Sequence, residues 1–169
     1  AENALYKQLA TNEADHGTVV LMEVKTGKVR AIANLSRDED GNYSEDYNYA
    51  IGESTEPGST FKLASMIALL EDGHVQPGDF VDVGNGETTY HGIKVEDSQR
   101  SARGLITVQR AFEVSSNVGI TKLTYENYKL KPEQFVNRLY EMGLNRKLGV
   151  EIRGEGEPSI KYPDSDSWS

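Results

Sequence analysis

The chain has 169 residues, which is enough for one domain with a real hydrophobic core and short for two. Hydrophobic residues make up 37% of it and charged residues 27%, as is ordinary for a globular protein. The formal net charge of -9 argues against nucleic acid or an anionic membrane as the main partner. The absence of cysteine excludes disulfides, thiolate metal sites and cysteine nucleophiles.

The first third of the chain predicts a short helix followed by a β-hairpin. Residues 4–10 have a helical pattern, and residues 18–24 and 28–33 are β-branched or alternating runs. A turn at residues 25–27, which ends in Gly27, joins the two runs. The polar residues 36–49 predict an exposed loop.

The next segment predicts a buried helix. Pro57 and Gly58 end the loop, and a helix is expected from about residue 59 to residue 72. Its apolar residues cover nearly the whole circumference, which is typical of a helix buried on all sides. Gly73 is expected to be its C-cap.

The remaining residues predict short strands and then three helices. Glycine-rich residues 78–98 contain β-like pieces at 80–83 and 88–90. Thr107 can cap a helix that runs to about residue 114, a second helix follows Asn117, and a third runs from Pro132 to Gly143. A short extended piece is expected at 148–152 and a loop from residue 155 onward, and no internal repeat is visible.

A serine and a lysine open the predicted buried helix. Ser59 and Lys62 are three residues apart and therefore lie on one helical face, near the positive end of the helix. The lysine amine can take the proton of the hydroxyl, which makes a nucleophile with its own base. The alternative is an ordinary first-turn serine beside a solvated lysine, because Ser-x-x-Lys alone is a weak motif.

A second polar motif follows at a break between predicted helices. Ser115, Ser116 and Asn117 lie downstream of residue 114. Taken by themselves, Ser115 and Asn117 favour helix capping between the two helices, a role that suits both residue types.

The amino-acid sequence around both motifs resembles that of a known family. Residues 48–62 read NYAIGESTEPGSTFK and residues 111–119 read AFEVSSNVG. They resemble the transpeptidase domain of a class B, monofunctional penicillin-binding protein, for which such a motif set is described. By this resemblance Ser59 attacks a carbonyl and is acylated, Lys62 is the base, Ser115 relays a proton to the leaving nitrogen, and Asn117 binds the substrate.

The resemblance implies an α+β fold in which an antiparallel sheet is backed by helices, with a helical subdomain between residues 63 and 143. Family members carry a third motif, Lys-Thr-Gly, on a strand after the Ser-x-Asn motif. The chain has Lys25-Thr26-Gly27, but this precedes Ser59 and lies in a predicted turn, so it is rejected as the third motif. Residues 1–169 are therefore expected to form a partial transpeptidase domain that lacks the C-terminal strands. In family members the strand that carries Lys-Thr-Gly supplies one of the two N–H groups of the oxyanion hole. Little activity is therefore expected of the chain by itself.

The implied function is peptidoglycan D,D-transpeptidation, the cross-linking of stem peptides through an acyl-enzyme that β-lactams also form. Two alternatives remain: a serine β-lactamase, and a non-enzymatic module that senses or binds β-lactams. The implied partners are peptidoglycan stem peptides, β-lactam antibiotics and cell-wall synthesis proteins, in the periplasm or on the outer face of the cytoplasmic membrane. No apolar run is long enough to cross a bilayer, so an anchor is expected only in the parent protein.

Two further expectations concern ligands and association. His16, His74 and His91 have no ligand-like spacing, so neither a metal nor a cofactor is expected. The strand at residues 18–24 would have one partner and one open edge. We therefore expect the chain by itself to associate through this edge, with a second copy or with a separate C-terminal piece.

Overall fold

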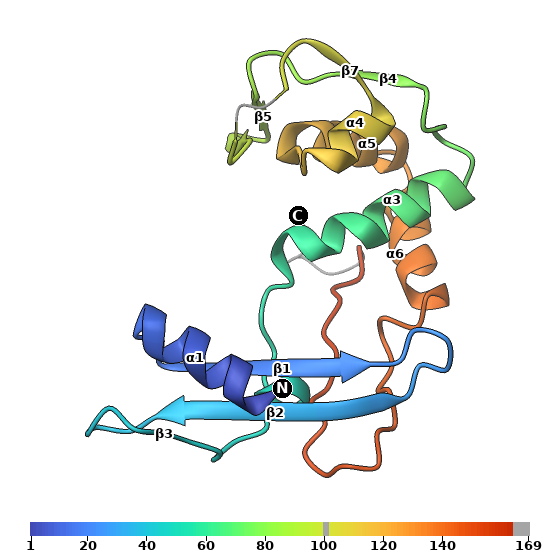
Figure 1. The fold of residues 1–169 in the computed structure, drawn as a ribbon. Helices are drawn as coiled ribbons and strands as arrows, with labels where there is room; N and C mark the ends of the chain where they lie inside the picture. The colour runs from blue at the N-terminus through green and yellow to red at the C-terminus, as the bar shows by residue number, and fades with distance from the viewer. Residues whose placement is uncertain (100–101, 164–169) are drawn as a thin grey trace. The chain divides into compact units, whose positions relative to one another are not determined.

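The computed structural model describes residues 1–99 and 102–163. The chain forms two compact units, one made of Ala1–Thr55 with Arg146–Pro158, the other of Glu56–Asn145 with the chain from Ser159 (Figure 1). Every predicted site residue belongs to the second unit. The prediction of one partial transpeptidase domain over the whole chain stays a prediction.

The first unit is a small antiparallel sheet with a helix on one face. The strands β1 (His16–Met22), β2 (Val29–Arg37) and β3 (Tyr43–Ser44) lie in the order β1-β2-β3. Helix α1 (Glu2–Asn12) packs on β1 and β2, as Figure 1 shows, and Leu9 is its buried residue. The predicted helix and hairpin are therefore confirmed, each slightly longer than expected.

The segment after the hairpin is more ordered than its polar sequence suggests. The predicted loop over residues 36–49 is wrong in part, because β2 continues to Arg37, β3 follows, and helix α2 (Tyr49–Gly52) begins at Tyr49. The buried Asn34 explains this order: its Nδ2 donates to Asn48 Oδ1 at 3.2 Å, and its Oδ1 accepts from Ala50 N at 3.2 Å. The Asn34 amide thus connects the segment at Asn48 and Ala50 to β2.

Strand β1 has one neighbour, β2, in the part of the chain that the structure describes. Toward its end Val20, Leu21 and Met22 are 46%, 57% and 56% exposed. An exposed apolar edge is the condition on which the expected self-association rests. That association stays a prediction.

The second unit contains four helices, a 3-10 turn and two short two-stranded sheets within its described residues. The turn covers Gly58–Thr60. The helices are α3 (Phe61–Glu71), α4 (Val108–Glu113), α5 (Asn117–Tyr128) and α6 (Pro132–Glu141). Strand β4 (Phe80–Asp82) pairs with β7 (Leu105–Thr107), and β5 (Glu87–Tyr90) pairs with β6 (Ile93–Glu96), all antiparallel. The sequence predicted the helices and the regions of β4 and β5 but missed β6 and β7.

The core of this unit lies between α3, α4 and α5. Leu69, Val83, Val118 and Ala111 are fully buried members of one hydrophobic cluster. Gly119 lets α5 approach closely, because a Cβ there would lie 2.9 Å from Ala111 Cβ. The packing fixes the N-terminal end of α5 against the rest of the unit.

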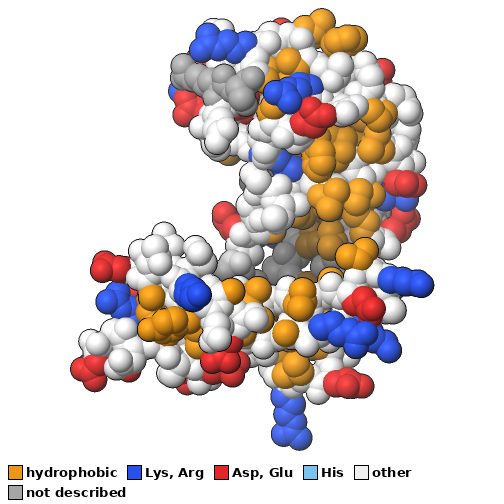
Figure 2. Space-filling view, viewed as in Figure 1, with side chains coloured by type: hydrophobic (Ala, Val, Ile, Leu, Met, Phe, Trp, Pro, Cys, Tyr) orange, Lys and Arg blue, Asp and Glu red, His pale blue; other side chains and the backbone are white. Residues whose placement is uncertain are grey.

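Helix α3 does not fit the prediction that it is buried on all sides. Leu63, Ile67 and Leu70 form an exposed stripe at 55%, 37% and 36%, whereas Met66 and Leu69 face the core. Figure 2 shows hydrophobic side chains at the surface of this unit. The helix does end as predicted: Gly73 has φ 69°, and His74 N donates to Leu69 O at 3.0 Å, the pattern of a Schellman cap.

Two points concern the remaining residues. The extended piece expected at 148–152 is wrong: the structure has no strand there, and Leu148 N and Gly149 N instead donate to the Glu155 carboxylate. Residues 155–163 have no helix or strand, as expected, and residues 164–169 of that predicted loop lie outside the described part. Within the described residues, no helix is both long and apolar enough to cross a membrane.

Candidate active site

The predicted nucleophile lies in a tight turn that leads into α3. Gly58 has φ 57°, a conformation that glycine adopts without a Cβ penalty, and the 3-10 turn Gly58–Thr60 follows. Ser59 is exposed, and its Oγ accepts a hydrogen bond from Lys62 Nζ at 3.1 Å. The expected one-turn spacing therefore brings the hydroxyl and the amine within hydrogen-bond distance.

The same ammonium reaches the second motif. Lys62 Nζ donates to Ser115 Oγ at 2.9 Å and to the Ser115 carbonyl oxygen at 2.7 Å. A lysine ammonium has three protons, and here all three acceptors are neutral oxygens. Burial lowers the pKa of Lys62, while the negative charge of Asp97 works in the opposite direction, and the net shift is downward. The arrangement thus favours a lysine that can lose its proton.

The backbone of Ser115 has a left-handed conformation. Ser115 lies between α4 and α5 with φ 53°, one of three described residues other than glycine in the left-handed region. Ser116, not Ser115, is the N-cap of α5: its buried Oγ accepts from Gly119 N at 2.9 Å. Ser115 instead caps α4 with its backbone: Ser115 N donates to Phe112 O and Ser116 N donates to Ala111 O, both at 2.9 Å, the pattern of a Schellman cap. The capping alternative therefore holds for the Ser115 backbone, while its hydroxyl accepts from Lys62.

Asn117 begins α5 beside this turn. Its Nδ2 donates to the Glu96 carbonyl oxygen at 2.6 Å, so one end of the amide is already used to tether the end of β6. The capping alternative is wrong for Asn117, because its side chain bonds a different segment.

No sequence motif points to Asp97, a carboxylate that lies beside this turn. Asp97 follows β6 and accepts hydrogen bonds from Ser116 Oγ and from Val118 N. It precedes Ser116 by 19 residues, in a polar stretch without a motif. Its position could be found only from the tertiary structure.

The other sequence candidates lie in different surroundings. Gly27 has φ 69° in the β1–β2 turn of the first unit, which agrees with the rejection of Lys25-Thr26-Gly27 as a catalytic motif. His16 stacks on Tyr49, and His74 packs edge-on against Tyr128. Across residues 1–99 and 102–163, no group of three His, Cys, Asp or Glu side chains could hold a metal ion.

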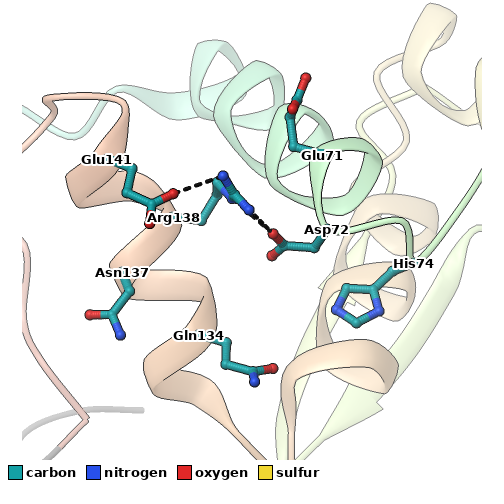
Figure 3. A pocket seen from close by; sticks show the side chains of 7 residues that line it. All are labelled: Glu71, Asp72, His74, Gln134, Asn137, Arg138 and Glu141. Atoms are coloured by element: carbon teal, nitrogen blue, oxygen red, sulfur yellow. Dashed lines mark hydrogen bonds and ion pairs between the residues drawn. The ribbon is translucent and has the colours of Figure 1, made fainter.

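A polar hollow of about 580 Å³ lies at the far end of α3, between that helix and α6. Figure 3 shows Arg138 between Asp72 and Glu141, with Glu71, His74, Gln134 and Asn137 around them. Asp72 accepts hydrogen bonds from Tyr128 Oη at 2.7 Å and from Arg138 Nε at 2.8 Å. None of the four predicted site residues lines this hollow, and its central charges already neutralise each other.

Comparison with known proteins decides the family. Residues 17–165 match the family model for the penicillin binding protein transpeptidase domain. The chain belongs to this family. The resemblance to the class B kind and the α+β fold are thereby confirmed.

Individual relatives agree with this assignment. The chain is 30% identical to penicillin-binding protein PbpB of Mycobacterium tuberculosis over 92% of its own length and 23% of that protein. It is 29% identical to peptidoglycan D,D-transpeptidase FtsI of Escherichia coli, over 98% of the chain and 27% of that protein. The crystal structure of penicillin binding protein 3 from Mycobacterium tuberculosis superposes with a TM-score of 0.76 at 28% identity, covering 99% of this chain and 39% of the other. The chain thus spans about a quarter of the curated relatives that it matches.

Proposed function

We propose that the chain carries the nucleophile, base and proton relay of a peptidoglycan D,D-transpeptidase. The observation that supports this most strongly is the position of Lys62, whose ammonium contacts Ser59 Oγ and Ser115 Oγ at once. One amine therefore connects the attacking oxygen to the group that can deliver a proton to the leaving nitrogen. The homology to proteins named as D,D-transpeptidases points to the same reaction.

In the proposed mechanism, neutral Lys62 takes the proton of Ser59, and the oxygen attacks the carbonyl of the D-Ala-D-Ala peptide bond. The Ser59 N–H, at the start of α3, donates to the oxyanion that forms. The proton passes from Lys62 through Ser115 to the departing amine, which leaves as D-Ala. The amine of a second stem peptide then attacks the acyl-enzyme and restores Ser59. Asn117 Oδ1 accepts from an amide of the bound peptide.

β-Lactams acylate the same serine in this proposal, because their strained amide mimics the D-Ala-D-Ala terminus. The natural substrate places the site outside the cytoplasm, with the parent protein anchored in the membrane and working beside other cell-wall synthesis proteins. Residues 118–169 contain no Lys-Thr-Gly, and the strand with that motif supplies the second oxyanion N–H in the family. We therefore expect residues 1–169 by themselves to be acylated at least about a hundredfold more slowly than the full-length gene product.

The test is covalent labelling of the full-length gene product with a fluorescent penicillin, with Ser59→Ala as the variant. Wild type should be labelled and Ser59→Ala should not, while Ser54→Ala, a nearby serine outside the motif, should be labelled normally. Labelling of Ser59→Ala at the wild-type rate would rule out the assignment. Release of the label within seconds would indicate a β-lactamase, and stable labelling without any cross-linking of stem peptides would indicate a binding module.

The expected association through the β1 edge needs a separate measurement. Size-exclusion chromatography with light scattering on residues 1–169 at micromolar concentration should show dimers or larger species. Val20→Lys, on the exposed part of the edge strand, should shift the chain toward monomer. A stable wild-type monomer would contradict the expectation.

A further inference from the structure

Asp97 has no role in the proposed mechanism, yet its carboxylate makes several hydrogen bonds to the residues around Asn117. Its two carboxylate oxygens lie 3.1 and 3.0 Å from Ser116 Oγ, which donates to them. One of them also accepts from Val118 N at 2.9 Å, in the first turn of α5. The carboxylate therefore binds the residues on both sides of Asn117, at the positive end of a helix of 12 residues.

The segment that carries Asp97 is itself fixed along α5. Asp97 N donates to Gly86 O at 2.9 Å, which closes the open end of the β5–β6 hairpin. At the turn of the hairpin, Tyr90 packs on Tyr125 with ring centroids 4.5 Å apart, and His91 Nε2 lies 3.1 Å from Tyr125 Oη. The hairpin thus contacts α5 at two places about two turns apart, so that the carboxylate has little freedom to move.

The residues that Asp97 binds are neighbours of the candidate catalytic ones. Ser116 is 1% exposed and connects Ser115 to Asn117. Ser115 has φ 53°, a conformation that a serine keeps only when its surroundings impose it. The backbone bonds that end α4, from Ser115 N to Phe112 O and from Ser116 N to Ala111 O, set this conformation. The bonds that Asp97 accepts from Ser116 and Val118, and those that Lys62 donates to Ser115, hold the turn from its two sides.

We propose, on the basis of the proposed transpeptidase function, that Asp97 is a positioning residue for the acylation of Ser59: it clamps the turn through Ser116 and Val118, and its charge acts on Lys62. The clamp holds the Ser115 hydroxyl against the amine and the Asn117 amide against the substrate. A misplacement of a reacting group by about 1 Å can cost on the order of a hundredfold in rate.

The charge of Asp97 gives this role a distinct signature. Lys62 is faced by Ser59 in the 3-10 turn that precedes its helix and by Ser115 in the turn between α4 and α5, both neutral. Among the described residues, Asp97 is the charged group that shifts the pKa of Lys62, and it raises that pKa against the effect of burial. Loss of the charge therefore lowers the pKa of Lys62. The acid-side midpoint of the acylation rate then moves to lower pH, because acylation needs the neutral amine.

The experiment compares three variants in the full-length gene product: Asp97→Asn, Asp97→Ala and Asp82→Asn. Asparagine keeps an oxygen that can accept from Val118 N, whereas alanine keeps none. Asp82 is the matched control, because it lies in the same glycine-rich region and accepts from Gly84 N at 2.8 Å without contacting residues 115–118. The rate of acylation by a fluorescent penicillin is measured from pH 5 to pH 10, about the range in which a lysine with a lowered pKa titrates, and corrected for the folded fraction.

We expect folded Asp97→Ala to be acylated about ten- to a hundredfold more slowly at every pH. Asp97→Asn should recover to within about threefold of wild type at alkaline pH, with its midpoint moved to lower pH. Asp82→Asn should match wild type in both respects. If Asp97→Ala does not fold, the pH midpoint of acylation in Asp97→Asn alone decides whether the proposal holds.

The proposal is overturned if the Asp97→Asn midpoint equals that of wild type, or if folded Asp97→Ala is acylated as fast as Asp82→Asn. Absence of labelling in the wild type would instead refute the proposed function on which this inference rests. The two failures are therefore distinguishable in one data set.

Discussion

The charged side chains at the two ends of α3 have opposite surroundings. At the first turn, the Lys62 ammonium is surrounded by neutral oxygens of Ser59 and Ser115. At the last turn, the Asp72 carboxylate is bound by the Arg138 guanidinium and the Tyr128 hydroxyl. One end of the helix leaves its charge without an opposite charge in contact, and the other end neutralises it.

The pKa is lowered at both ends, but this favours the neutral form of the lysine and the charged form of the aspartate. The pKa of Lys62 is lowered mainly by burial, which favours the neutral amine. At Asp72, burial alone would raise the pKa, but hydrogen bonds from Tyr128 and Arg138 and the charge of Arg138 lower it, which favours the charged form. The first end is therefore suited to proton transfer and the second to stability, and each can be altered without the other.

The largest expected effect comes from Lys62. Lys62→Ala and Lys62→Arg should both slow acylation by about 10²–10⁴-fold, because arginine keeps the charge but cannot act as a base. Lys129→Arg, at an exposed lysine of the same unit, should leave the rate unchanged. The measurement is the rate of fluorescent-penicillin labelling, and a Lys62→Arg variant that reacts at the wild-type rate would show that this lysine is not the base.

Substitution of Ser115 or Asn117 should lower the acylation rate, by less than substitution of Lys62 does, with little loss of stability. Ser115→Ala and Asn117→Ala should each slow acylation by about a hundredfold, the lower end of the range for proton-transfer groups. Their effect on the free energy of unfolding should be about 1 kcal/mol or less, because neither side chain is the N-cap of α5. Ser116→Ala is the matched comparison, since it removes the true N-cap and should cost about 1–2 kcal/mol. Normal acylation together with a collapse of stability in Ser115→Ala would make that residue purely structural.

At the other end of α3, Arg138→Met should lower the free energy of unfolding by about 1.5–3 kcal/mol, because it leaves a carboxylate that is only 16% exposed without its cation. Acylation of the folded fraction should not change. Glu141→Gln removes the outer, 64% exposed partner of the same arginine and should cost less than about 1 kcal/mol. Urea unfolding gives both values, and equal losses in the two variants would contradict the contrast between buried and exposed partners.

The smallest expected effect is the acid dependence of Asp72. Because, against the effect of burial, hydrogen bonds and the charge of Arg138 lower its folded-state pKa below the ordinary value of 3.8, its contribution to stability is present above that value and is lost as the pH falls through the folded pKa. Asp72→Asn should therefore lose less stability than wild type as the pH falls from 5 to 2. Urea midpoints across this range provide the check, and parallel curves for the two proteins would show that Asp72 does not contribute.

The elements that the sequence predicted well are those with a local cause. Gly27 and the β-branched runs define the hairpin, Thr107 caps α4, and Pro132 begins α6. The spacing of Ser59 and Lys62 was likewise enough to place hydroxyl and amine together. In each case the determining residues are within a few positions of one another.

What the sequence could not show depends on contacts between distant residues. The order after β2 depends on the Asn34 amide. The contact of the Ser115 hydroxyl with Lys62 joins residues 53 positions apart. Asp97 has no motif, and its importance rests on hydrogen bonds to a turn about twenty residues later. The exposed stripe on α3 could not be anticipated either, because an apolar circumference does not say which side the core covers.

The left-handed conformation of Ser115 places this position under two opposing selective pressures. Glycine would adopt φ 53° without strain, so Ser115→Gly should stabilise the fold by about 1 kcal/mol while it deletes the hydroxyl. Selection for folding alone would therefore drive the position toward glycine, and only selection for catalysis opposes it. A deep mutational scan that scores abundance and β-lactam labelling separately should show glycine at residue 115 enriched in the first screen and depleted in the second.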